Sequence, residues 1–249
     1  GCFPVYAWPS AMLQLKLWRH WAHAFNTFVA NSDATKRRLE TEGIHPIQVI
    51  WNGVPARPLG AELSPRPTAV FAGRLVYEKG ATDLLEAFDA VRSRIPDAML
   101  LIAGDGPERP RLISEIARLG LESSVTMLGH VSRQELERRF SGAWVQVVPS
   151  RWEEPFGLTA AESMMRGTAV IATNTGGLPE FVRHNETGIL VPPQDPRALA
   201  EALGSLLGNP EPARRLGLQG RAFALQHLTM DTFVDRFIQL YELLCQSKS

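Results

Sequence analysis

The sequence predicts a doubly wound α/β domain built on a parallel sheet. From Thr68 onward, short apolar runs alternate with segments whose apolar residues recur at helical spacing. Continuous apolar runs are typical of strands that are buried on both faces, which occur in parallel sheets with helices on each side. Ligands of such sheets bind at the carboxyl ends of the strands. The loops that follow the strands are therefore where function should lie.

The expected strands are the apolar runs at residues 69–72, 99–103, 125–128, 145–148, 169–172 and 189–191. The expected helices between them include residues 81–94, 108–119 and 132–141. Ser132 followed by Glu135 is a capping box, which predicts a helix start. Three consecutive helices without an intervening strand are expected at residues 196–207, 210–226 and 230–244.

The region before Thr68 has a different organisation. We expect one helix over about residues 11–27, a strand at residues 28–30, a short helix capped by Ser32, and a strand at residues 47–51. Residues 57–67 contain several prolines and are interpreted as a linker. The chain opens without an initiator methionine, so we expect Gly1 to be a fragment boundary.

The composition excludes several classes of protein. Lys plus Arg and Asp plus Glu number 26 each, so no bulk charge attracts nucleic acid. Cys2 and Cys245 have neither metal-ligand spacing nor a disulfide pattern, which fits a reducing compartment such as the cytoplasm. No apolar run approaches the roughly 20 residues that span a bilayer, and the opening segment lacks the order of a signal peptide.

The loop after the first main strand suits a diphosphate. It runs from Gly73 and Arg74 to Lys79 and Gly80, directly before a helix. Small residues let backbone amides approach a ligand, the helix N-terminus favours negative charge, and the two cations supply charge-assisted hydrogen bonds. The alternative is two cations on an ordinary surface loop.

A second loop, after the strand at 145–148, carries two carboxylates, Glu154 and Glu162. Glu154 lies in the loop and Glu162 in the second turn of the next helix, so both could face one cleft and accept hydrogen bonds from vicinal sugar hydroxyls. A solvated helix residue is the alternative for Glu162. However, neighbours such as Ala161 and Met164 indicate a buried helix. An unpaired carboxylate there would cost on the order of several kcal/mol, so it would need a ligand or a cation.

Two glycine loops complete the candidate site. Gly176 and Gly177 could bring amides to a phosphate or sugar, or could form a simple turn. Gly104 and Gly106 suggest dinucleotide binding, but Arg109 stands where that fingerprint requires its third glycine. An NAD(P)-dependent oxidoreductase is therefore disfavoured.

Taken together and in order, these motifs resemble the donor-binding domain of family-4 retaining glycosyltransferases of the two-domain GT-B type. The resemblance spans about residues 68–191 and rests on Gly73-Arg74, Glu78-Lys79-Gly80, Gly104-Asp105-Gly106-Pro107, Pro149-Ser150, Glu154-Pro155-Phe156-Gly157, Glu162, Gly176-Gly177 and Pro179-Glu180. Asn31-Ser32 and Asn52-Gly53-Val54 resemble the end of the family's first domain and its hinge. The resemblance thus implies an acceptor-domain remnant (1–56), a hinge (57–67), a Rossmann-like donor domain (68–228) and a crossover helix (229–249).

The resemblance also implies roles for individual residues. Arg74 and Lys79 would hold the donor diphosphate, and Glu162 the ribose hydroxyls. Glu154 would hold the donor sugar, together with the backbone of Phe156, Gly157 and Leu158. The loop Gly129-His130-Val131 would lie near the base, and Gly73 and the Gly176-Gly177 pair would line the donor site. Enzymes of this type use no metal or other cofactor, and the sequence has no Asp-x-Asp motif.

The implied function is transfer of a sugar from a UDP- or GDP-sugar to a saccharide or lipid-linked acceptor, in cell-surface polysaccharide or glycolipid synthesis. The alternative is a nucleotide-sugar-binding fragment without activity, because most of the acceptor domain is missing. The helix over residues 11–27 is amphipathic. It is interpreted as a core-facing helix without its domain, with peripheral contact at the inner membrane face and homodimerisation as alternatives.

Overall fold

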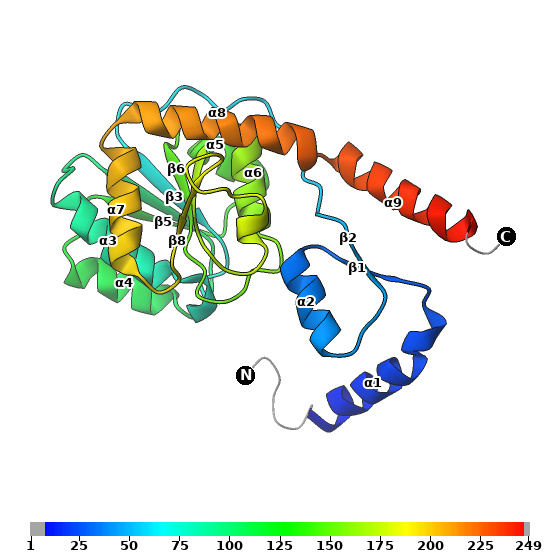
Figure 1. Ribbon diagram of the computed structural model, residues 1–249. Coiled ribbons are helices and arrows are strands. Elements are labelled where there is room, and N and C mark those ends of the chain that lie inside the picture. The colour runs from blue at the N-terminus through cyan, green and yellow to red at the C-terminus, as the bar shows by residue number, and fades with distance from the viewer. Residues whose placement is uncertain (1–7, 247–249) are drawn as a thin grey trace.

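The computed structural model describes residues 8–246, and its main body is a six-stranded sheet covered by helices on both faces (Figure 1). The strand order is β5-β4-β3-β6-β7-β8, and every neighbouring pair is parallel. The strands are β3 (Thr68–Ala72), β4 (Met99–Ala103), β5 (Val125–Gly129), β6 (Val145–Val148), β7 (Ala169–Thr173) and β8 (Ile189–Val191). The predicted doubly wound parallel sheet is confirmed. Cys2 and the boundary expected at Gly1 lie outside the described residues, and Cys245 is an exposed free thiol.

Alternate residues of each strand enter two different cores, because successive side chains point to opposite faces. Ala69 and Phe71 pack with Phe88 on one face, and Val70 packs with Phe140 on the other. The first face is covered by α3 (Ala81–Arg92), α4 (Arg109–Arg118) and α7 (Pro196–Leu207). The second face is covered by α5 (Arg133–Phe140), α6 (Leu158–Arg166) and α8 (Pro210–His227). Both faces of the sheet are thus buried, as the continuous apolar strands predict.

The strand order places a topological switch point at the centre of the sheet. The chain moves outward from β3 through β4 to β5 and then returns to β6, which pairs with the other side of β3. The loops after β3 and β6 therefore leave the sheet side by side and in different directions. This is where ligands bind in open α/β sheets.

The residues before this unit form a small layer of their own. The strands β1 (Phe28–Ala30) and β2 (Ile47–Val49) are parallel and are joined through α2 (Asp33–Thr41). A small apolar core under α2 includes Ala30, Ile44 and Ile47. We call residues 28–54 the N-terminal unit. It is preceded by α1 (Trp8–Trp21) and the 3-10 helix η2 (Ala22–Ala24).

Several predicted boundaries differ from the structure. The helix expected over residues 11–27 is described from Trp8, the first described residue, and ends at Trp21. The strand expected to reach Trp51 ends at Val49, level with the last residue of its short partner β1. Ser132 caps α5 by accepting from the Glu135 amide (3.2 Å), but the Glu135 carboxylate pairs with Arg138 and Arg139 instead of completing the capping box.

Residues 57–67 contain no helix or strand and lie along the six-stranded unit. The Gly60 amide donates to the Arg166 carbonyl at the end of α6 (2.8 Å). At the other end of the chain, α9 (Met230–Gln246) has no buried residue among those described. Its first turn lies against Gly53, where an added Cβ would be 2.7 Å from the Phe233 Cβ. Figure 1 shows α9 continuing away from the six-stranded unit on the side of β2.

Candidate functional site

The loops after β3 and β6 meet through Lys79 and Glu154. Lys79 ends the 3-10 helix η3 (Tyr77–Lys79), and its ammonium group donates to the Glu154 carboxylate. Ser150 donates to the same carboxylate oxygen (2.5 Å). The Glu154 side chain is only 11% exposed, so this pairing neutralises most of the charge that burial would otherwise penalise. Lys79, which was predicted to bind the phosphate, and Glu154, which was predicted to bind the sugar, therefore lie in direct contact at the switch point.

A second ion pair joins the same two loops and was missed by sequence reasoning. Arg151 follows β6 and forms a bidentate pair with Asp83 in the first turn of α3 (Nε to Oδ2, 2.7 Å). The hydrogen bond with Asp83 is the main cause of a raised pKa of Arg151. The guanidinium also covers the ring of Tyr77 at 4.2 Å, and the Arg151 amide donates to the Glu78 carbonyl (2.8 Å). The sequence offered only the position of Arg151 shortly after a strand at the carboxyl edge, and it gave no sign that Asp83 of α3 is its partner.

Helices α3, α4 and α6 begin at this edge without a side-chain cap, and two of them begin after a glycine. The N-cap of α3 is Gly80 (φ +67°) and that of α6 is Gly157 (φ +101°), and neither can offer a side-chain acceptor. By contrast, α5, α7 and α8 are capped by the side chains of Ser132, Asp195 and Asn209. The first N–H groups of a helix need acceptors, and the helix N-terminus carries partial positive charge. Both features suit the binding of an anion between α3 and α6.

A cavity of about 270 Å³ opens at the same carboxyl edge of the sheet. Its wall is formed by the ends of β3 and β4 and the loop after β5, with the lining residues Ala72, Gly73, Arg74, Ala103, Gly104, Asp105, His130, Val131 and Leu136. Gly129 holds this wall together, because its carbonyl accepts from the Gly104 amide (2.8 Å). The structure thus brings Gly73 and Arg74 to the residues that were predicted near the base.

Glu162 differs from the expectation of a buried carboxylate. Helix α6 is buried as predicted, with Ala160, Ala161, Met164 and Met165 fully inaccessible. The Glu162 side chain, however, is 31% exposed and pairs with Arg133 of α5 (2.9 Å). Its position on the outward side of the helix explains the difference, and the cation that its charge required is Arg133. Burial lowers the pKa of Arg166 in the last turn of α6, while the charges of Glu137 and Glu162 act in the opposite direction.

The paired glycines after β7 pack against the Glu154 loop. The Gly177 amide donates to the Glu154 carbonyl (2.7 Å), so its hydrogen bond is with the protein backbone and not with a ligand. An added Cβ at Gly176 would lie 2.2 Å from that same carbonyl oxygen. The Phe156 side chain is buried and stacks on Phe181 (4.8 Å between centroids), which leaves its backbone for any ligand contact, and Leu158 is half exposed.

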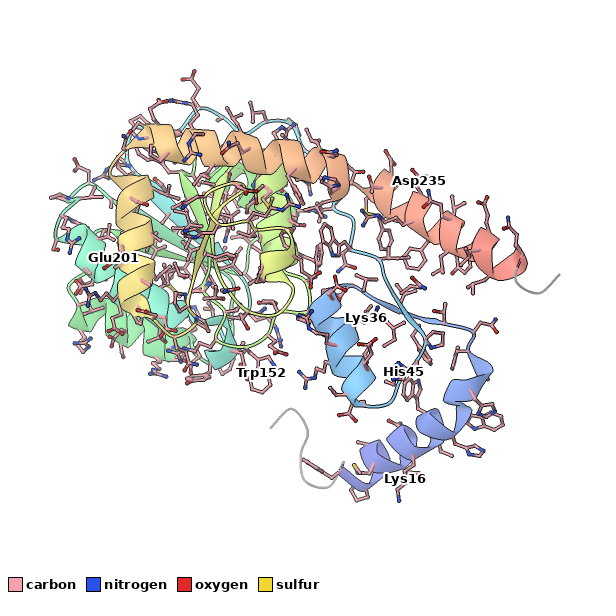
Figure 2. The ribbon with its side chains drawn as sticks, in the orientation of Figure 1. Lys16, Lys36, His45, Trp152, Glu201 and Asp235 are labelled. Atoms are coloured by element: carbon pink, nitrogen blue, oxygen red, sulfur yellow. The ribbon has the colours of Figure 1, made fainter. Side chains whose placement is uncertain are left out.

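The surface next to the Glu154 loop approaches α2. Trp152 is 62% exposed, and Figure 2 shows it at the edge of the six-stranded unit. The adjacent Glu153 lies 3.9 Å from Arg38 of α2. The candidate site therefore borders the N-terminal unit.

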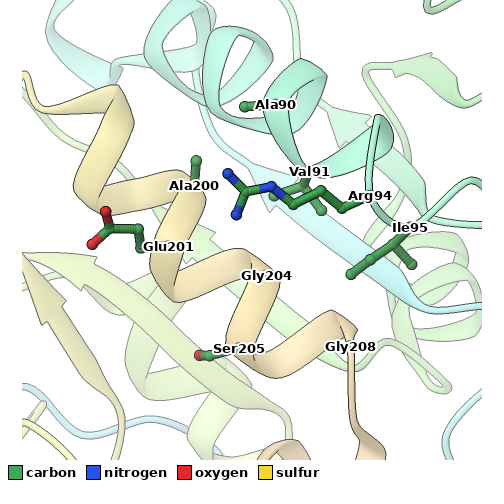
Figure 3. Close-up of a pocket in the computed structure, with 9 residues that line it drawn as sticks. All are labelled: Ala90, Val91, Arg94, Ile95, Ala200, Glu201, Gly204, Ser205 and Gly208. Atoms are coloured by element: carbon green, nitrogen blue, oxygen red, sulfur yellow. The ribbon is translucent and has the colours of Figure 1, made fainter.

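A further groove lies away from these motifs, between α3 and α7 (Figure 3). It has a volume of about 360 Å³ and is lined by Ala90, Val91, Arg94, Ile95, Ala200, Glu201, Gly204, Ser205 and Gly208. None of the residues predicted to bind a ligand takes part in it. Within residues 8–246, no cluster of three or more His, Cys, Asp or Glu side chains could hold a metal ion, and no helix is long and apolar enough to cross a membrane.

Comparison with known proteins places these features in a family. The sequence profile of the family described as glycosyl transferases group 1 matches residues 60–223. The chain is 36% identical to a glycogen synthase of Mycobacterium tuberculosis over 193 residues, which cover 76% of this chain and 45% of the relative. It is 34% identical over 176 residues to a GDP-mannose-dependent alpha-(1-6)-phosphatidylinositol monomannoside mannosyltransferase of the same species, covering 68% of this chain and 46% of the relative.

The fold is also that of solved structures. The Anabaena protein HepE, in complex with UDP and glucose, superimposes with a TM-score of 0.81 at 23% identity, covering 92% of this chain and 66% of HepE. At that identity the likeness shows the fold alone. The chain spans about half the length of the curated relatives it matches.

Proposed function

Because this chain belongs to the family glycosyl transferases group 1, we propose that it binds the nucleotide-sugar donor of a glycosyltransferase. The proposed reaction moves the sugar, with retention of configuration, from a UDP- or GDP-sugar to a saccharide or lipid-linked acceptor. The contact between Lys79 and Glu154 carries the proposal. The cation that we propose for the diphosphate lies beside the carboxylate that we propose for the sugar hydroxyls, at the switch point between β3 and β6.

The proposed donor lies across the carboxyl edge. Arg74 and Lys79 bind the diphosphate, aided by the uncapped N-termini of α3 and α6. The base occupies the cavity lined by His130 and Val131. Glu162 accepts hydrogen bonds from the ribose and exchanges part of its contact with Arg133 for them. Glu154 and the backbone at residues 156–158 hold the sugar.

In the proposed chemistry, the two cations stabilise the negative charge that develops as the diphosphate departs. The Lys79 ammonium group keeps N–H donors for the phosphate beside its contact with Glu154, and Arg74 carries the charge that is unpaired within residues 8–246. The scheme assigns no role to a metal. The departing phosphate accepts the proton of the acceptor hydroxyl on the face from which it leaves. Glu154 orients the sugar and forms no covalent bond with it. Trapping of a glycosyl adduct on Glu154 would contradict this scheme.

The names of the similar proteins agree with either candidate base. The mannosyltransferase relative is described as GDP-mannose-dependent, and HepE was solved with UDP and glucose. We therefore propose a UDP- or GDP-sugar, with a saccharide or lipid-linked acceptor in cell-surface polysaccharide or glycolipid synthesis at the cytoplasmic side. Peripheral membrane contact or dimerisation through α1 is a further proposal, supported by its exposed side chains Leu17, Trp18 and Trp21. Flotation with liposomes tests the membrane contact.

A thermal-shift measurement tests the donor site. The chain is screened against UDP, GDP, ADP, TDP and CMP with EDTA present, because the proposal needs no metal. A nucleotide at a hundred times its dissociation constant stabilises the fold by about 2.7 kcal/mol, which raises the melting temperature by several degrees. We expect one nucleoside diphosphate to give this shift, and Arg74→Ala to abolish it.

The matched control is Arg94→Ala, which removes another exposed arginine that lines a different cavity. This variant should retain the full shift. A shift that survives Arg74→Ala, or one that appears only without EDTA, would contradict the assignment. Turnover with an acceptor separates the transferase from the alternative, a unit that binds the nucleotide sugar without activity.

A further inference from the structure

Glu180 joins the six-stranded unit to the N-terminal unit. It ends the 3-10 helix η4 (Leu178–Glu180), directly after the paired glycines. Its carboxylate accepts hydrogen bonds from the amide of Asp33 (3.1 Å), the amide of Ala34 (3.0 Å) and the indole Nε1 of Trp51 (2.9 Å). All three donors belong to the N-terminal unit. We call these four residues the Glu180 clasp.

The clasp completes the N-terminus of α2. The first amides of a helix have no intrahelical acceptor. The Ser32 hydroxyl accepts from the third, Thr35 (3.0 Å), and Glu180 accepts from the first two, Asp33 and Ala34. A carboxylate is well suited to this position because it interacts favourably with the partial positive charge of the helix N-terminus. Glu180 thus holds α2 from a distance of 146 positions in the sequence.

The segment from Gly177 to Glu180 is also hydrogen-bonded to the loop that carries Glu154, the residue proposed to bind the sugar. Glu180 lies three residues after Gly177, whose amide donates to the Glu154 carbonyl (2.7 Å). On the other side, the Thr35 hydroxyl of α2 lies 3.3 Å from the Pro155 carbonyl, which shares the single hydroxyl proton with the nearer Asn31 side chain (3.0 Å). The start of α2, the glycine loop and the Glu154 loop therefore form one continuous set of hydrogen bonds.

We propose that Glu180 is a positioning residue that couples the seating of the N-terminal unit to the orientation of Glu154. When α2 and Trp51 are bound, the glycine loop and residues 153–157 are held in the arrangement in which Glu154 faces the sugar. When they are released, that loop gains freedom while the diphosphate ligands Arg74 and Lys79 keep their places. The role of Glu154 in this proposal rests on the proposed function.

Amide hydrogen exchange on the whole chain tests the coupling. Glu180→Gln keeps the size of the side chain but loses its charge and one of its acceptor oxygens. We expect exchange at Asp33 and Ala34 to accelerate at least about tenfold, residues 153–157 to lose protection as well, and residues 74–79 to be unchanged. Trp51→Phe removes a single donor and should produce the same pattern more weakly.

The control is Glu186→Gln, which changes an exposed carboxylate near the same loop, 3.9 Å from its partner Arg183. It should leave all three segments unchanged. Unaltered exchange at Asp33 and Ala34 in Glu180→Gln would overturn the clasp. Faster exchange there without any change at residues 153–157 would overturn the coupling.

A binding ratio separates positioning from general loosening. The dissociation constant of UDP is divided by that of UDP-glucose, and that of GDP by that of GDP-mannose, for the wild type and for Glu180→Gln. In Glu180→Gln we expect this ratio of dissociation constants, which measures how much the sugar adds to affinity, to fall about five- to tenfold, as for the loss of one hydrogen bond. The affinity for the nucleoside diphosphate alone should be unchanged. An equal loss for both ligands, or no loss, would overturn the proposal. If the wild type binds neither nucleotide, the proposed function fails, and the exchange measurement still decides on the clasp.

Discussion

The carboxyl edge of the six-stranded sheet and the N-terminal unit both contain helix N-termini, but the two regions treat the free amides differently. At the edge, α3 and α6 begin after Gly80 and Gly157, which offer no side-chain acceptor. In the N-terminal unit, the first three amides of α2 are bonded to Glu180 and Ser32. One region leaves its first helix amides without a side-chain acceptor, and the other bonds them to a carboxylate of the neighbouring unit.

The two regions also differ in what holds them. The loops of the carboxyl edge are fixed by close backbone contacts and by ion pairs with little exposure, such as Asp83 with Arg151. The N-terminal unit has a small core of its own and meets the six-stranded unit through hydrogen bonds, exposed charges and the apolar packing of Trp51 and Val54. If the proposals above hold, the carboxyl edge is the more rigid of the two regions, and the seating of the N-terminal unit is the part that changes. Paired substitutions, one in each region, test this.

The largest difference is expected between Gly80→Ala and Gly43→Ala. Both glycines have left-handed backbones, with φ of +67° and +77°, so the conformational cost of an alanine, about 1–2 kcal/mol, is shared. A Cβ at Gly80 would lie 2.0 Å from the Pro149 carbonyl oxygen, whereas nothing lies within 4 Å of one at Gly43. We expect Gly80→Ala to lower the free energy of unfolding by about 4 kcal/mol or to prevent folding, and Gly43→Ala by about 1 kcal/mol.

Urea titration followed by circular dichroism measures both variants. Equal losses would mean that the loops after β3 and β6 can separate without cost. The carboxyl edge would then be no more rigid than the turn that contains Gly43.

A smaller difference is expected between two ion pairs. Asp83→Asn leaves the Arg151 guanidinium, 13% exposed, without its charged partner, and should lower the free energy of unfolding by about 3 kcal/mol. Glu153→Gln removes the partner of Arg38, where both side chains are more than 60% exposed, and should cost less than about 1 kcal/mol. The same titration measures both. A loss in Glu153→Gln as large as that in Asp83→Asn would show that the N-terminal unit is held as firmly as the edge.

Much of the architecture could be predicted from the sequence. The apolar runs gave the six strands because burial on both faces leaves little room for polar residues, and the rule for open parallel sheets located Arg74, Lys79 and Glu154 at one edge. The specific partners could not be predicted in this way. Lys79 and Glu154 were assigned to different parts of the ligand, and only the structure shows that they touch.

Other contacts were missed because they join segments that are remote in sequence. Glu180 was noted only as part of a motif, while its donors lie in α2 and at Trp51. Hydrophobic periodicity tells which face of a helix is buried, but it carries no information on which polar side chain reaches across to another segment. The exposure of Glu162 was missed for a similar reason. Its apolar neighbours indicated that the helix is buried, but they did not indicate on which side of the helix Glu162 lies.

The smallest expected difference is between the two serine caps. Ser132→Ala removes the side-chain acceptor of α5 and should lower the free energy of unfolding by about 1 kcal/mol, and Ser32→Ala should cost a similar amount. The discriminating measurement is local amide exchange. In Ser32→Ala, the Thr35 amide should exchange faster while Asp33 and Ala34 stay protected, because Glu180 still accepts from them. If all three amides lost protection together, the Glu180 carboxylate would not hold α2 independently of Ser32. The start of α2 would then depend on its serine cap alone, as the start of α5 does.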